Sequence, residues 1–224
     1  IITFDAHDPR VQNAIPLSGF ETVRPTYQFI KGLLRTVPDL IIDSDHMMAI
    51  SPDEGGTSRA VYLANVLGLD MGMFYKRRDY TQIADGRNPI VAHEFLGSSV
   101  EGKDVIIIDD MISSGDSIID VATELKRRKA KRIFAAATFG LFTNGLDKFD
   151  KAYEEGIIHG ILTTNLIYQT PELLSRPYYI NCDLSKYIAL LIDTLNHDGS
   201  ISSILSPNER IQHVVQKYKN GEPI

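Results

Sequence analysis

Val105-Ile-Ile-Ile-Asp109-Asp110-Met-Ile-Ser113-Ser114-Gly115-Asp116-Ser117 is the stretch of the chain that decides the fold. Its four consecutive aliphatic residues are typical of an inner strand of a parallel sheet, in which both faces are buried. Ligands of such sheets bind at the carboxyl ends of the strands, and the two aspartates fall at that end. The pattern therefore predicts an α/β fold with a ligand site directly after this strand.

The same stretch predicts two kinds of ligand chemistry. Asp109 and Asp110 can accept hydrogen bonds from the vicinal hydroxyls of a ribose. The short residues at 113–117 let backbone N–H groups and hydroxyls surround a phosphate, and the helix that follows would direct its positive end at it. The alternative is an ordinary turn in which Ser114 or Asp116 caps that helix.

Composition limits the classes of function. The chain has 224 residues, which suits one α/β domain, and its 23 basic and 29 acidic residues give a net charge of −6. A net acidic chain argues against a nucleic-acid partner, because such proteins bind phosphates with an excess of cations. No apolar run is long enough to span a bilayer, so no membrane partner is expected. The single cysteine, Cys182, allows no intrachain disulfide and favours a cytoplasmic protein.

Strand and helix patterns alternate along the chain. Strands are predicted at 47–50, 71–75, 105–108, 133–138, 160–163 and 178–181, and helices at 26–35, 58–67, 118–128 and 146–155. This alternation predicts a mostly parallel sheet flanked by helices on both faces. The polar stretch 76–88 is interpreted as an exposed loop.

The ends of the chain suggest its organisation. The sequence starts without methionine, inside the apolar run Ile1-Ile2-Thr3-Phe4, so we expect it to be the later part of a longer protein. Residues 1–18 are then the remnant of a preceding N-terminal domain and a connector. Residues 19–206 form the α/β domain, and 207–224 form a C-terminal helical extension.

A second loop carries phosphate chemistry. Ser51-Pro52-Asp53-Glu54-Gly55-Gly56 follows one predicted strand and precedes a helix. Paired glycines let backbone amides approach a pyrophosphate closely, and Asp53 can hold magnesium through an oxygen or through its waters. A plain glycine turn with a helix cap is the alternative interpretation.

Two weaker motifs complete the set. Asp5-Ala6-His7 places an acid and an imidazole two residues apart at a strand end, where both could face a metal. Lys76-Arg77-Arg78 could neutralise the charge that develops on a transferring phosphoryl group. Each motif, taken alone, is also common among solvated surface charges.

In this order, the four motifs resemble those of the ribose-phosphate diphosphokinase family, also called phosphoribosyl-diphosphate synthetases, which have the type I phosphoribosyltransferase fold. The resemblance makes 19–206 a phosphoribosyltransferase-like domain. It implies transfer of the diphosphoryl group of ATP to ribose 5-phosphate, which gives phosphoribosyl diphosphate and AMP. It also implies a Mg²⁺ cofactor and a homo-oligomer.

The resemblance assigns a role to each motif. His7 and Asp53 would hold magnesium, with Asp5 close by. Lys76 and Arg78 would be the catalytic cations. The remaining assignments are the ribose hydroxyls to Asp109 and Asp110, the 5-phosphate to Ser113, Ser114, Gly115, Asp116 and Ser117, and the diphosphate to the turn formed by Asp53, Glu54, Gly55 and Gly56.

The match has departures. The family loop commonly reads Asp-Thr-Gly-Gly-Thr where this chain has Ser113-Ser114-Gly115-Asp116-Ser117. Asp116 puts a carboxylate where the family has a glycine, so it should weaken phosphate binding unless it turns outward or caps the helix. We expect this short chain to have little synthetase activity alone. Two alternatives stay open at this point: a nucleobase phosphoribosyltransferase, and a non-catalytic regulatory relative of the synthetase.

Overall fold

The computed structural model describes residues 1–78 and 90–224, and it describes the side chains of all of these except 76–78 and 90–93. The helices and strands are β1 (Ile2–Phe4), η1 (Pro9–Ala14), β2 (Glu21–Val23), α1 (Thr26–Thr36), β3 (Met47–Ser51), α2 (Thr57–Leu67), β4 (Asp70–Arg78), β5 (Ile90–Leu96), β6 (Asp104–Ile112), α3 (Asp116–Arg127), β7 (Arg132–Gly140), α4 (Asp147–Glu154), β8 (Gly160–Thr164), α5 (Pro171–Leu174), β9 (Tyr179–Cys182), α6 (Ser185–Asn196), α7 (Ser202–Leu205) and α8 (Asn208–Lys219).

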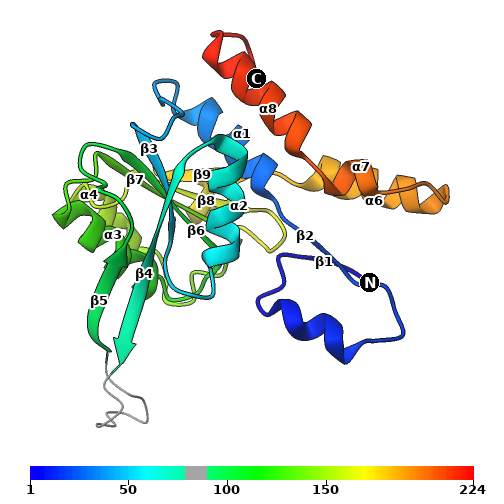
Figure 1. Ribbon diagram of the computed structural model, residues 1–224, viewed down its shortest axis with the longest axis horizontal. Helices are drawn as coiled ribbons and strands as arrows, with labels where there is room; N and C mark the ends of the chain where they lie inside the picture. Colours follow the sequence, from blue (N-terminus) through cyan, green and yellow to red (C-terminus); the bar gives the residue numbers. More distant parts are fainter. Residues whose placement is uncertain (79–89) are drawn as a thin grey trace.

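A seven-stranded sheet forms the centre of the molecule, with the strand order β5-β4-β3-β6-β7-β8-β9 (Figure 1). Every pair from β4 to β9 is parallel, whereas β5 runs antiparallel to β4 at one edge. The predicted mostly parallel sheet is therefore confirmed. One local interpretation was wrong: the backbone of 76–78 continues β4 and pairs with β5, so the polar stretch does not begin as a loop.

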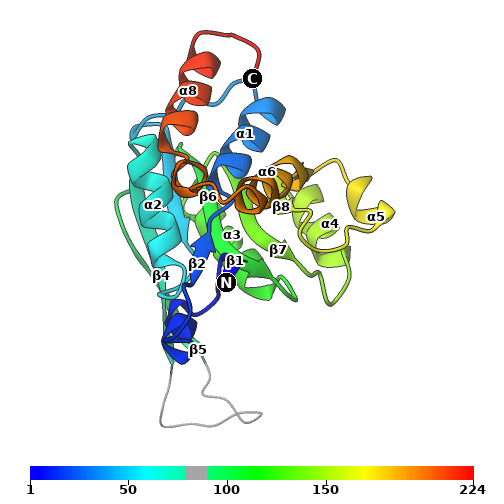
Figure 2. The same ribbon diagram turned by 90° about the vertical axis from the view of Figure 1, so that its right-hand side faces the viewer.

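Alternate residues of the inner strands point to two separate cores. Met47 and Ala49 of β3 pack on one face with α1, α2 and α8, while Met48 and Ile50 pack on the other face with α3 and α4. This period of two is the geometry of a strand buried on both faces. The two views of the ribbon show the sheet between these helices (Figure 2). The prediction that helices cover both faces is confirmed.

The order of the strands fixes where a ligand site can form. From β3 the chain crosses to β4 on one side, and β6 later pairs with the other side of β3, with Ile50 opposite Ile107. The direction of winding thus reverses between β3 and β6. A crevice forms outside the carboxyl ends of the strands at such a point. The loops 51–56 and 113–115 both start there.

The first residues of the chain lie beside this crevice. β1 and β2 pair in parallel as a separate two-stranded sheet, and the backbone N–H of Asp5 donates to the carbonyl of Val23 at 2.9 Å. Figure 1 shows this small sheet next to the main body, near the N-terminus. As a result, the segment 5–10 is carried toward the ends of β3 and β6. In the part of the chain that the structure describes, no helix is both long and apolar enough to cross a membrane.

Candidate functional site

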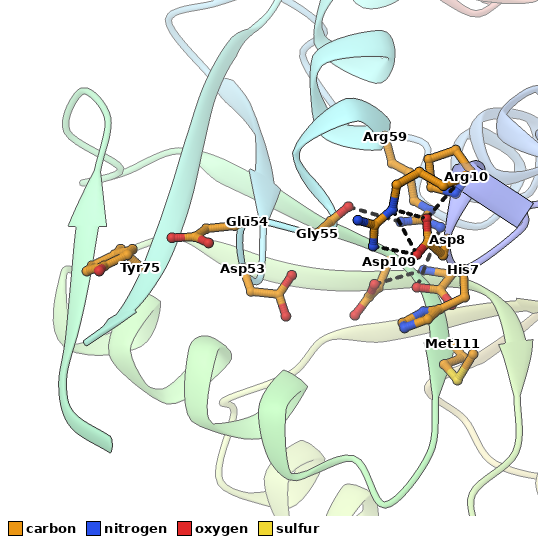
Figure 3. Close-up of a pocket in the computed structure, with 12 residues that line it drawn as sticks. His7, Asp8, Arg10, Asp53, Glu54, Gly55, Arg59, Tyr75, Asp109 and Met111 are labelled. Carbon is orange, nitrogen blue, oxygen red and sulfur yellow. Dashed lines mark hydrogen bonds and ion pairs between the residues drawn. The ribbon is translucent and has the colours of Figure 1, made fainter. Parts of the chain in front are cut away.

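A pocket of about 710 Å³ lies at the crevice between β3 and β6 (Figure 3). Most of its lining comes from three separate stretches of the chain, namely the segment after β1, the loop after β3 and the end of β6, while α2 and β4 add one residue each. Tyr75 of β4 lies at the far end of the pocket in the close-up. The lining residues are His7, Asp8, Pro9, Arg10, Asp53, Glu54, Gly55, Arg59, Tyr75, Asp109, Asp110 and Met111.

A buried ion pair anchors the segment after β1 to the body. Arg59 Nε donates to Asp5 Oδ1 at 2.8 Å, and Thr138 Oγ1 donates to Asp5 Oδ2 at 2.6 Å. All three residues are buried. Both carboxylate oxygens of Asp5 thus accept hydrogen bonds from protein donors. This carboxylate fixes the loop that presents His7, and the expected position of Asp5 close to a metal stays a prediction.

The same arginine reaches the sugar strand. Arg59 Nη2 lies 3.6 Å from Asp110 Oδ1, while Asp110 Oδ2 lies 2.8 Å from His7 Nδ1. The Asp110 side chain is only 4% exposed, whereas that of His7 is 75% exposed. The hydrogen bond with Asp110 raises the pKa of His7 above its ordinary value of 6.5. Asp110 therefore orients the imidazole through Nδ1 and leaves Nε2 to face outward.

Asp109 has a different environment from its neighbour. Its side chain is partly buried, and Oδ1 accepts the backbone N–H of Asp110 at 2.9 Å. Burial is the main cause that raises the pKa of Asp109 to about 7, and the nearby carboxylates of Asp110 and Asp53 add to it. A ligand that brings positive charge or hydrogen-bond donors to this carboxylate would favour its ionised form.

The loop after β3 is a tight turn held by its own hydrogen bonds. Ser51 Oγ donates to the carbonyl of Asp53 at 2.6 Å, and the N–H of Gly56 donates to Asp53 Oδ1 at 3.2 Å. A Cβ atom on Gly56 would lie 2.8 Å from Ser51 Oγ and 3.4 Å from the carbonyl of Ile108. Glycine suits this position because a Cβ atom would meet the Ser51 side chain within the turn itself. Asp53, Glu54 and Gly55 are thereby exposed to the pocket.

The loop 113–117 lies beside the pocket but not in its lining. Gly115 has φ +84°, and a Cβ atom there would lie 2.1 Å from Phe149 Cζ of α4. Asp116 is the first residue of α3, and its carboxylate forms an ion pair with Lys148 of α4. Ser114 Oγ also donates to Asp116 Oδ2 at 2.8 Å. Of the two expected orientations for Asp116, the structure has the outward one.

The structure thus brings six of the fifteen predicted site residues together in one pocket. His7, Asp53, Glu54, Gly55, Asp109 and Asp110 share the pocket, and Gly56 shapes the turn beneath it. Lys76 and Arg78 have side chains outside the described part. Among the residues whose side chains are described, no group of three or more histidine, cysteine or acidic side chains is placed to hold a metal. Residues 113–117 follow β6 at the same end of the sheet.

Sequence reasoning missed Arg59, which connects Asp5, Asp110 and the carbonyl of Gly55. The signal available was a cation on the apolar face of α2, next to the buried residues Ala60 and Leu63. A charged side chain on such a face needs a partner, because an unpaired charge is costly to bury. Thr138, inside an apolar strand, gave no comparable signal.

The lining of the pocket is acidic. It contains five carboxylates, those of Asp8, Asp53, Glu54, Asp109 and Asp110, against the guanidinium groups of Arg10 and Arg59. Arg10 is ion-paired with Asp8, and Arg59 is paired with Asp5. A bare polyphosphate would be repelled by this surface, whereas a polyphosphate carrying divalent cations would be attracted to it.

Comparisons with known proteins show the family of the chain. The model of the phosphoribosyl transferase domain family matches residues 29–159. A ribose-phosphate pyrophosphokinase of Vibrio parahaemolyticus is 31% identical over 164 residues, which are 72% of this chain and 49% of that protein. One of Pasteurella multocida is 30% identical over 209 residues, which are 92% of this chain and 61% of that protein.

A solved structure has the same fold. The phosphoribosylpyrophosphate synthetase from Mycobacterium smegmatis superposes with a TM-score of 0.70 at 22% identity, over 89% of this chain and 59% of that one. The chain therefore spans about half to three fifths of the length of the relatives it matches. The predicted resemblance and the predicted fold are both confirmed.

Proposed function

We propose that this chain, which belongs to the phosphoribosyl transferase domain family, acts as a ribose-phosphate diphosphokinase. The reaction transfers the β,γ-diphosphoryl group of ATP to the anomeric hydroxyl of ribose 5-phosphate. A bond forms between the anomeric oxygen and the β-phosphorus, and the bond from that phosphorus to the α,β-bridging oxygen breaks. The products are phosphoribosyl diphosphate and AMP. Since ATP and ribose 5-phosphate are intracellular metabolites, we place the reaction in the cytoplasm.

The observation that carries this proposal is the convergence of three distant stretches on one acidic pocket. His7, Asp53 and Asp109 come from different parts of the sequence and all line it. A site that only binds a sugar phosphate has no need of so many carboxylates around an exposed imidazole. The pocket suits a pentose next to a cation-bound polyphosphate, which is the substrate pair of a diphosphokinase.

The two ends of the sugar would be held by different groups. Asp109 and Asp110, at the end of β6, would accept hydrogen bonds from the ribose hydroxyls. Five residues further on, the loop 113–117 and the start of α3 would receive the 5-phosphate. The sugar would then lie along the end of β6, with its anomeric carbon toward the pocket.

The residues present fit magnesium that arrives with a polyphosphate. The protein offers His7 and Asp53 as ligands, while Asp5 is engaged by Arg59 and Thr138. Mg²⁺ usually keeps several waters and needs only one or two protein groups when substrate phosphates complete its coordination. When bound, the ion would neutralise phosphate charge and polarise the phosphorus that is attacked. Lys76 and Arg78, at the end of β4, remain the proposed cations for the transferring group.

Substrate binding and turnover can be tested separately. Titration calorimetry with ribose 5-phosphate measures the sugar site, and AMP release from ATP, ribose 5-phosphate and Mg²⁺ measures the transfer. We expect Asp109→Asn to weaken ribose 5-phosphate binding by about tenfold or more, since it removes a charged hydrogen-bond acceptor. Asp120→Asn is the matched control, because Asp120 is an exposed acid on α3 away from the pocket.

Three results would contradict the proposal. Release of diphosphate from phosphoribosyl diphosphate only in the presence of a nucleobase would identify a nucleobase phosphoribosyltransferase. If Asp109→Asn binds ribose 5-phosphate as tightly as the original chain, the sugar does not bind at the end of β6. Binding without any AMP formation, in this chain and in any longer natural form, would favour the regulatory relative.

A further inference from the structure

The loop 113–117 rests on helix α4 and on the turn that precedes it. Gly115 sits directly over the ring of Phe149, where no side chain could be accommodated. The N–H of Thr143 donates to the carbonyl of Ser113 at 3.0 Å, and the hydroxyls of the same two residues lie 3.4 Å apart. The shape of the loop is therefore set by its contacts with α4 as well as by its own sequence.

Helix α4 also supplies a charge to the loop. Lys148, in the first turn of α4, pairs with the carboxylate of Asp116, which is the only acid within 113–117. The Lys148 side chain is 46% exposed and that of Asp116 is 58% exposed. The pair is accessible to solvent and lies on the side of the loop that faces α4.

Asp116 would compete with a phosphate for the same positive charge. It occupies the first position of α3, where a carboxylate interacts favourably with the exposed N–H groups and the dipole of the helix. An anionic ligand uses the same groups. The hydrogen bond from Lys148 lowers the pKa of Asp116, so the carboxylate is ionised at neutral pH. Its negative charge therefore competes with that of a bound phosphate for the start of α3.

We propose that Lys148 is a positioning residue for the 5-phosphate: it holds the Asp116 carboxylate toward α4 and neutralises it, so that the loop accepts a phosphate monoester despite its acid. This inference rests on the proposed function, since it takes residues 113–117 as the phosphate site. Lys148 acts through Asp116 and not by direct contact with the ligand. The departure of this loop from its family pattern would thus be compensated by a cation 32 residues further along the chain.

Three variants separate this role from the alternatives. In Lys148→Met the carboxylate is no longer neutralised, and we expect the dissociation constant for ribose 5-phosphate to rise about fivefold at low salt, an effect that added salt should reduce. Asp116→Asn removes the competitor and should tighten binding. In the double variant Lys148→Met with Asp116→Asn, the affinity should return to within about twofold of the original, because nothing is left to neutralise.

Lys151→Met is the matched control. Lys151 lies one turn further along α4 and is 74% exposed, with Glu155 as its partner at 3.8 Å. The substitution removes the same charge from the same helix without touching the loop. Urea unfolding of all four variants establishes that they are folded, and titration calorimetry with ribose 5-phosphate and with inorganic phosphate gives the affinities.

Each outcome decides the question. A double variant as weak as Lys148→Met would mean that Lys148 contacts the phosphate itself, which overturns the positioning role. An Asp116→Asn variant as weak as Lys148→Met would mean that the intact pair is needed for the shape of the loop, and this also overturns it. If the original chain binds ribose 5-phosphate and Lys148→Met binds it equally well, only this inference fails. If the original chain binds neither ribose 5-phosphate nor inorganic phosphate, the proposed function fails with it.

Discussion

The two ends of the proposed site are held in contrasting ways. At the end proposed for metal and diphosphate, buried charges connect distant stretches of the chain: Arg59 joins Asp5 to Asp110, and Asp110 orients His7. At the phosphate end, Gly115 fits against Phe149 and an exposed pair joins Asp116 to Lys148. The first end is held by buried charges, each of which would be costly to leave without its partner. The second end is held by the shape of the backbone, with an ion pair exposed at its surface.

This difference indicates which end tolerates change. Removing one member of a buried ion pair leaves an uncompensated charge, so substitutions at Asp5, Arg59 or Asp110 are expected to destabilise the whole fold. An exposed pair contributes little to stability, and its members can be replaced at small cost. The loop 113–117, proposed for the 5-phosphate, is the part that departs from the family pattern, in agreement with this expectation.

Arg59→Met should have the largest effect. It leaves the Asp5 carboxylate buried with Thr138 as its remaining described donor, and should lower the free energy of unfolding by about 3–5 kcal/mol. Urea unfolding measures this loss. Arg10→Met is the control, since Arg10 pairs with Asp8 at the surface and its loss should leave the unfolding midpoint unchanged. A loss below about 1 kcal/mol in Arg59→Met would mean that this end is held no more tightly than a surface pair.

Gly115→Ala should have the next largest effect, because it combines a clash with an unfavourable backbone conformation. With φ +84° and Phe149 Cζ 2.1 Å from the new Cβ, we expect a loss of about 2–3 kcal/mol in the free energy of unfolding.

Gly145→Ala provides the comparison for this variant. Gly145 has φ +78°, but nothing lies within 4 Å of its Cβ position, so only the conformational cost of about 1 kcal/mol remains. Equal losses at the two glycines would show that contact with α4 does not shape the phosphate loop. If the contact does shape the loop, Phe149→Leu combined with Gly115→Ala should be less damaging than the sum of the two single losses.

The mostly parallel sheet and the edge at which its two loops lie could be predicted from sequence because their signals are local. The aliphatic run of β6 and the acids and small residues after it occupy one continuous stretch, and the same holds for β3 and its glycine turn. Rules for parallel sheets then place both loops at one edge. The position of His7 does not follow from local signals alone, because the pairing of β1 with β2 is what brings His7 toward the ends of β3 and β6.

The contacts that hold the site together could not be predicted in this way. Asp5 is 54 residues from Arg59 and 133 from Thr138, and nothing in the pattern around Asp5 selects these partners over a metal. The side-chain direction of Asp116 was equally open, because both an outward and a capping orientation satisfy the carboxylate. Lys148 decides between them, and it belongs to another helix.

Asp109→Asn should have the smallest effect on stability, and its sign depends on pH. The pKa of Asp109 is raised to about 7 in the folded chain from an ordinary value of 3.8, so between pH 4 and 7 the unfolded chain has released a proton that the folded chain still holds. The free energy of unfolding therefore falls as the pH rises through this window, and the loss is complete above pH 7. Asparagine has no proton to lose, so at pH 8 the variant should be more stable than the original by on the order of 1 kcal/mol, with a smaller difference at pH 5. Urea unfolding at both pH values measures this change.

Asp116→Asn should show the opposite sign, because the pKa of Asp116 is lowered by Lys148 and the ionised form is the stabilising one. If Asp109→Asn gives the same difference at pH 5 and pH 8, the Asp109 carboxylate is not held in an unfavourable environment, and the contrast between the two neighbouring aspartates of β6 does not hold.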